Sequence, residues 1–202
     1  HGGRYAYHRQ PQIMHWNMAC LANAFIPLIE LQHSESDSQT LLKEVLSEFP
    51  VIYSEAWLTL FRQKLGLQTE QDSDIDLIEK LMQALNDSQV DFTSFFRQLS
   101  QISSSTPVSE IGLRDHFIDR PLIDQWFADY LARLKAESSN DQSRKVAMDL
   151  VNPKYILRNH LAQIAIEKAQ QGDYSETNTL LQLLSKPFDE QVRYEEYAKP
   201  PP

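Results

Sequence analysis

Apolar residues recur every three or four positions along most of this chain, a spacing that predicts amphipathic helices. The clearest case is the segment 74–85, where Ser73 and Asp76 resemble a capping box. Asp91 is suited to cap the next helix, and no useful stretch alternates apolar and polar residues as a strand would. We therefore expect an all-α fold. Three apolar faces carry this expectation: Ile75, Ile78, Leu81, Met82 and Leu85; then Phe92, Phe95, Phe96, Leu99 and Ile102; then, after Pro121, Leu122, Ile123, Trp126, Phe127, Tyr130, Leu131 and Leu134.

Prolines and polar stretches predict where the N-terminal helices end. A proline in the first turn favours a helix over 11–25, and Pro27 would bend or end it. The polar stretch 33–38 is typical of a loop. Pro50 predicts a kink in the helical segment that follows, and Gly66 predicts its end.

The C-terminal third is divided in the same way. Asn152 and Pro153 have the order of an N-cap and a first helical residue, so they predict the start of a long helix that Gly172 closes. Asp173 and Glu176 form a D-x-x-E pattern that predicts the start of a last helix, which ends before Pro187. We expect an extended tail over 187–202.

These segments predict one helical domain over residues 1–202, an irregular multi-helix bundle. The serine-rich stretch 103–109 is the best candidate for a mobile connection within it. The composition agrees, because the chain has 25 Leu and only 5 Gly. Glycine-dependent devices such as phosphate loops are therefore not expected in this stretch of sequence.

Charge and cysteine content narrow the class of protein. A net charge of −9 and a pI near 5.1 exclude a general nucleic-acid binder, which needs a basic face. No apolar run reaches the ~20 residues that cross a bilayer, so we expect no membrane partner. With Cys20 as the single cysteine, no internal disulfide forms, and a cytoplasmic location is the simpler expectation.

Two groups of residues are candidates for a chemical role. His1, His8 and His15 recur at a fixed interval, but metal pairs on a helix need a spacing of four, so we favour no metal site. Asp115 and His116 could form a nucleophile system with Cys20, but Cys20 is better interpreted as a small core residue.

Three further features are interpreted structurally. The aromatic residues of the helix after Asp91 predict core packing and not base stacking. Arg158 lies on an apolar helix face, which predicts an ion pair with an acid of a neighbouring helix. The turn 172–174 resembles a tetratricopeptide hairpin, but only one copy is present, and solenoids need about three.

Several motifs together resemble the selenoprotein O family, and they run in the same order along the whole chain. They are Gly3-Arg4-Tyr5, Gln10-Pro11, Trp16-Asn17, Leu21-Ala22, Arg62-Gln63-Lys64-Leu65-Gly66, Asp91-Phe92-Thr93, Phe96-Arg97, Leu99-Ser100, Arg114-Asp115, Phe117-Ile118-Asp119-Arg120, Trp126, Tyr130, Arg133-Leu134, Val151 to Asn159, Leu161-Ala162-Gln163, Ala165-Ile166-Glu167, Gly172-Asp173 and Pro187-Phe188. The sequence departs from the family pattern in two places. Cys20 stands where the family usually has Arg, and this sequence ends at Pro200-Pro201-Pro202, without the cysteine- or selenocysteine-bearing tail of the family.

The resemblance implies the helical C-terminal part of a protein-kinase-like fold. Family members are protein adenylyltransferases, which use ATP and Mg to pass AMP to hydroxyl side chains of target proteins. Their catalytic, nucleotide-binding and metal-binding residues all precede the position of His1. We therefore expect no catalytic, cofactor or metal residue in this chain, no activity of the chain alone, and partners that include the rest of its kinase-like domain and protein substrates. The alternative is a stand-alone helical interaction module.

Overall fold

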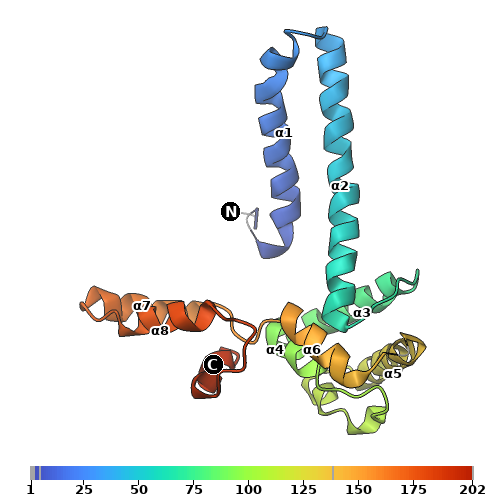
Figure 1. Ribbon diagram of the computed structural model, residues 1–202, viewed down its shortest axis with the longest axis vertical. Helices are drawn as coiled ribbons and strands as arrows, with labels where there is room; N and C mark the ends of the chain where they lie inside the picture. The colour runs from blue at the N-terminus through green and yellow to red at the C-terminus, as the bar shows by residue number, and fades with distance from the viewer. Residues whose placement is uncertain (1–2, 5, 138, 202) are drawn as a thin grey trace. The chain divides into compact units, whose positions relative to one another are not determined.

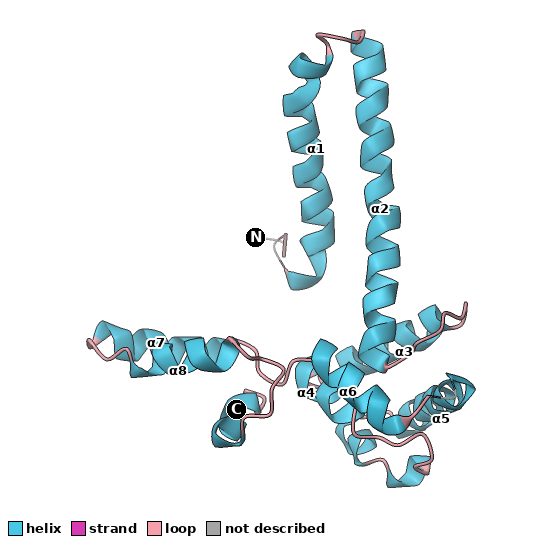
Figure 2. Cartoon of the chain, viewed as in Figure 1, coloured by secondary structure: helices cyan, strands magenta, loops and turns pink. Residues whose placement is uncertain are grey.

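The computed structural model describes residues 3–4, 6–137 and 139–201, with Tyr7 in its backbone only. Within these ranges the chain consists of helices and loops, without strands (Figure 2). The predicted all-α fold class is thus confirmed. The α-helices are α1 (Gln10–Ile29), α2 (Glu35–Leu65), α3 (Asp74–Asp87), α4 (Phe92–Leu99), α5 (Arg120–Glu137), α6 (Asp141–Val151), α7 (Asn159–Gln170) and α8 (Ser175–Leu184), and the short 3-10 helices are η1 (Tyr7–Arg9), η2 (Val108–Glu110), η3 (Gly112–His116) and η4 (Val192–Ala198) (Figure 1).

The chain divides into two compact units, an N-terminal unit over His1–Leu60 and a C-terminal unit over Phe61–Pro202. In the N-terminal unit, α1 lies beside the first part of α2 (Figure 1). The His15 ring stacks on the Phe49 ring with centroids 5.1 Å apart, and the Phe49 centroid lies 6.2 Å from that of Tyr53. No apolar side chain described in this unit is buried.

The C-terminal unit has a core of aromatic and aliphatic side chains. Trp126 and Tyr130 of α5 lie at its centre, 2% and 0% exposed, and their rings stack with centroids 5.1 Å apart. Their polar atoms are also used: the Trp126 indole donates to the Leu77 carbonyl at 2.8 Å, and the Tyr130 hydroxyl donates to the Leu65 carbonyl at 2.9 Å. Each buried ring thus keeps a hydrogen-bond partner, as a stable core requires.

Helices α7 and α8 form a hairpin with a small core of its own. Leu161, Ala165 and Leu180 are buried there, and Leu184 and Tyr197 pack against them. Gly172 ends the first helix as predicted, with a φ of +81° that favours glycine over residues with a Cβ.

The N-terminal helices are longer than the sequence predicts. Helix α1 continues through Pro27 to Ile29, and α2 continues through Pro50 without a break. The predicted loop 33–38 is wrong, because α2 begins at Glu35. The Ser34 hydroxyl accepts from the Asp37 amide at 3.2 Å and donates to the Asp37 carboxylate at 2.7 Å, which starts the helix early.

Helix α3 begins at Asp74 as predicted, but without the predicted capping box, and the predicted helix start at Asn152 is wrong. Ser73 makes no capping hydrogen bond, and the Asp74 carboxylate accepts from the Gln71 amide at 2.9 Å instead. Asn152 follows α6 and does not cap α7, which begins only at Asn159. The Asn152 side chain accepts from the Lys64 ammonium at 2.8 Å and donates to the Lys64 carbonyl at 3.0 Å.

The last segments differ from the prediction in detail. Helix α8 begins at Ser175, and the Asp173 carboxylate accepts from the Ser175 amide at 2.9 Å. The tail is not extended throughout, because Val192–Ala198 form η4. The mobile connection at 103–109 remains an expectation, although Ser103 donates to Asp141 at 2.5 Å.

Candidate functional site

One face of α1 carries a regular apolar stripe. Helix α1 contains no Asp, Glu, Lys or Arg. Five apolar residues recur along it at alternating spacings of four and three, which places them on one face. We call them the α1 stripe: Met14, Met18, Leu21, Phe25 and Leu28, which are 55%, 39%, 59%, 47% and 60% exposed.

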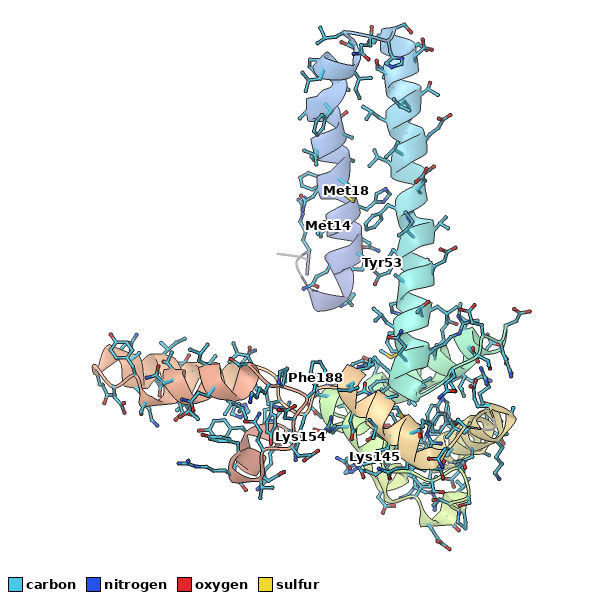
Figure 3. All side chains as sticks on the ribbon, viewed as in Figure 1. Met14, Met18, Tyr53, Lys145, Lys154 and Phe188 are labelled. Carbon is cyan, nitrogen blue, oxygen red and sulfur yellow. The ribbon has the colours of Figure 1, made fainter. Side chains whose placement is uncertain are left out.

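The α1 stripe is not the face that packs on α2. The least exposed positions of α1 include His15, whose ring stacks on Phe49, and Met18 lies nearest to that side (Figure 3). Polar residues such as Asn23 occupy the opposite side of the helix. An exposed apolar stripe without charged residues is characteristic of a surface that another protein segment covers, so the α1 stripe is a candidate surface for binding such a segment.

The histidine interval does not assemble a metal site. His1 lies outside the described residues, His8 is exposed, and His15 stacks on Phe49. No group of three or more His, Cys, Asp or Glu that could hold a metal ion occurs in the described ranges.

The suggested nucleophile system is not supported either. Cys20 is exposed, so its interpretation as a core residue is wrong: it lies on the side of α1 that is turned away from α2. Asp115 is held 2.6 Å from Arg120 in an ion pair.

Lys64 occupies an unusual position near the end of α2. Its ammonium lies 4.7 Å from the centre of the Phe96 ring and 5.3 Å from that of Phe92, and its one described hydrogen bond goes to the neutral Asn152 side chain. Burial lowers the pKa of Lys64 to about 8. Of the aromatic residues after Asp91, Phe95 and Phe96 form core as predicted, at 1% and 0% exposure, whereas Phe92 is 39% exposed.

Arg158 pairs with an acid, as the sequence predicts. Its guanidinium makes two hydrogen bonds to the Asp91 carboxylate, at 2.8 and 2.9 Å. These bonds and that from Ser94 lower the pKa of Asp91 to about 2 against the opposing effect of burial. Asp91 also caps α4 by accepting from the Ser94 amide at 2.8 Å, so one carboxylate joins α4 to the start of α7.

A second buried ionic network was missed by the sequence reading. The Asp74 side chain is fully buried and accepts from Arg62 and Arg133, each at 2.7 Å. Burial alone would raise the pKa of Asp74, but the hydrogen bonds from Arg133, the Gln71 amide and Arg62 lower it. Arg133 also donates to Glu137. In the sequence, Asp74 lies outside the apolar face of the helix that it begins. The amphipathic pattern therefore places it at the surface and gives no sign that it is buried.

Between α7 and α8 lies an apolar groove of about 440 Å³. Its floor is formed by small residues of α7 and leucines of α8, with Leu181 67% exposed. The lining residues are Leu157, Ala162, Ala165, Ile166, Ala169, Thr177, Leu180, Leu181, Leu184 and Ser185.

These features define an all-helical protein with an uncovered apolar helix and a separate helical hairpin, and no helix of the described part is long and apolar enough to cross a membrane. A family model described as protein adenylyltransferase SelO matches residues 1–185. This chain belongs to that family, whose members are protein nucleotidyltransferases.

Curated relatives match over nearly the whole of this chain. Proteins named protein nucleotidyltransferase YdiU are 46% identical in Burkholderia lata over 99% of the chain, 45% in Burkholderia multivorans over 100%, and 44% in Burkholderia vietnamiensis over 99%. In each case the chain spans 40% of the length of the relative.

Proposed function

We propose that this chain is the C-terminal helical part of a protein adenylyltransferase with a kinase-like fold. In the proposed reaction, a Ser, Thr or Tyr hydroxyl of a target protein attacks the α-phosphorus of ATP. An oxygen–phosphorus bond forms, the bond to the β-phosphate oxygen breaks, the hydroxyl proton leaves, and pyrophosphate is released. The family match over residues 1–185 supports this class of activity.

The role that we propose for this chain rests on the exposure of the α1 stripe. Five apolar side chains, each 39% to 60% exposed, lie along a helix without charged residues. Burying such a stripe stabilises a complex by roughly 25 cal/mol for each Å² of apolar surface removed from water. We infer that the stripe packs against the part of the kinase-like domain that corresponds to the remaining length of the relatives.

Among the described residues no group of three or more His, Cys, Asp or Glu could hold a metal ion, and the resemblance places the metal ligands of the family before the position of His1. No chemical step is therefore assigned to a side chain of this chain. Its role in the proposal is to support the catalytic part and to offer surface to protein substrates.

The test is a chimaera. The part of the Burkholderia lata relative without a counterpart here is joined to residues 1–202, and the product is incubated with Mg²⁺, ATP labelled in the α-phosphate, and bacterial protein. We expect transfer of label to protein by the chimaera and none by residues 1–202 alone. Absence of transfer by a folded chimaera, with the full relative active in parallel, would contradict the proposal, as would transfer by residues 1–202 alone.

A pair of variants tests the stripe. Leu21→Glu places a charge in the middle of the α1 stripe, and Asn23→Glu places the same charge on the opposite side of the helix. We expect Leu21→Glu to abolish transfer by the chimaera and Asn23→Glu to retain it. Equal activities of the two variants would show that the stripe does not contact the catalytic part.

The α7–α8 groove favours a second candidate function, a helical interaction module that binds an amphipathic helix of another protein. The two functions differ in a simple observation. The interaction module would be favoured if the chimaera is inactive and residues 1–202 bind a partner helix. That binding should then be lost on Leu181→Asp.

A further inference from the structure

The α7–α8 hairpin is attached to the rest of the C-terminal unit through a narrow connection. It has its own small core, and the most extensive helix contact of α7 and α8 is with each other. Residues 152–158 connect it to α6, and the tail that follows α8 lies beside them: the amides of Lys154 and Tyr155 donate to the Pro187 carbonyl at 2.8 and 3.1 Å. The hairpin could therefore open without unfolding the main core.

Residues 186–199, which we call the strap, cross this connection and bond to its α4 side. Arg97 of α4 donates to the Glu190 carboxylate at 2.7 Å and to the Phe188 carbonyl at 3.1 Å. Lys154 donates to Glu190 at 2.5 Å and to Glu195 at 2.6 Å. Figure 3 shows Lys154 and Phe188 close to where the hairpin joins the other helices.

The same strap also bonds to the hairpin. The Tyr197 hydroxyl donates to Glu176 of α8 at 2.7 Å, and the Gln191 side chain donates to the Leu183 carbonyl at 3.2 Å. Arg158, at the start of α7, donates to the Ala198 carbonyl at 3.3 Å. The strap is thus hydrogen-bonded both to α4 and to the α7–α8 hairpin.

The bonds on the α4 side are mainly ionic and partly exposed to solvent. The Glu190 side chain is 55% exposed and that of Glu195 is 48% exposed, whereas Lys154 and Arg97 are 13% and 9% exposed. Exposed ion pairs weaken with salt more than apolar contacts do. The apolar core around Trp126 has no such dependence.

We propose that the strap is an ionic latch centred on Glu190, which, together with the Arg158–Asp91 pair, holds the α7–α8 hairpin against α4 and α6, and whose release loosens the hairpin while the core stays folded. The latch is a property of the fold and does not depend on the transfer of AMP. Its release would uncover Tyr155, which is 1% exposed and donates to the Gln191 carbonyl at 3.0 Å.

Hydrogen exchange of the full chain tests the latch. We expect Glu190→Gln to speed the exchange of α7 and α8 amides about tenfold, and high salt to do the same to the unchanged protein, while α3 and α5 amides keep their rates. The matched control is Glu196→Gln, because the Glu196 side chain is 78% exposed and its ion pair is with Lys199 of the strap itself. This control should leave all rates unchanged.

A second variant separates the latch from general destabilisation. Lys154→Met removes one of the two cationic partners of Glu190, and the double variant should speed exchange less than the product of the two single effects. Unchanged α7 and α8 rates in Glu190→Gln, or an equal increase in α3 and α5, would overturn the proposal. So would independent effects of the two substitutions.

Discussion

The two units use similar apolar residues with opposite results. In the C-terminal unit, Trp126 and Phe96 are 2% and 0% exposed, and the buried Asp74 and Arg158 each have a partner of opposite charge. In the N-terminal unit, Phe25 and Leu28 are 47% and 60% exposed. The spacing of apolar residues is regular in both.

This difference shows what an amphipathic pattern does and does not determine. Period and spacing determine which face of a helix is apolar, because they follow from 3.6 residues per turn. They do not determine what covers that face. The C-terminal unit buries most of the apolar faces of α4 and α5, whereas the α1 stripe is exposed within its unit, which is why we assign it to contact with another segment.

The largest expected effect is at the centre of the covered core. Trp126→Ala should lower the free energy of unfolding of the C-terminal unit by about 3–5 kcal/mol, because it leaves a cavity and frees the Leu77 carbonyl. Leu28→Ala on the α1 stripe should change stability by less than about 0.5 kcal/mol. Urea unfolding followed by far-ultraviolet circular dichroism measures both, and similar losses would remove the contrast between the units.

The second expected loss of unfolding free energy is smaller and comes from the buried ionic network around Asp74. Asp74→Ala should cost about 3 kcal/mol, because Arg62 and Arg133 then lose a shared buried carboxylate. Asp76→Ala, two residues along at an exposed position of α3, is the matched control and should have little effect. If the two variants unfold at the same urea concentration, the network does not stabilise the unit.

The smallest effect concerns Lys64 and pH. Its pKa is about 8 in the folded chain against 10.5 ordinarily, so between these values the unfolded chain binds more protons. Stability should therefore rise from pH 8 to 10.5 in the unchanged protein relative to Lys64→Met, and the difference should be constant below pH 8. Urea unfolding across this range measures it, and a pH-independent difference would show that burial does not perturb Lys64.

Much of the helical layout follows from local rules. Asp91 caps α4 and Gly172 ends α7 because both effects depend only on neighbouring backbone groups. The pairing of Arg158 was also predictable, since a cation on an apolar face needs an acid, although the sequence did not identify Asp91 as that acid.

The errors occur where distant residues compete with local rules. Asn152 and Pro153 have the order of a helix start, but the Asn152 side chain bonds to Lys64, 88 positions away in sequence. Cys20 shares a helix with Trp16 and Ala24, which predicts a small core residue, but it is exposed because no described segment covers that side of α1. Candidate docking surfaces were the least predictable, because the exposure of the α1 stripe is a property of the three-dimensional structure.

The most direct test of the account is the hydrogen exchange of α1 in two proteins, residues 1–202 alone and the chimaera with the catalytic part of the Burkholderia lata relative. If the α1 stripe packs against that part, the amides of α1 should exchange at least about tenfold more slowly in the chimaera, with α5 unchanged. Equal rates for α1 in the two proteins would contradict the central claim.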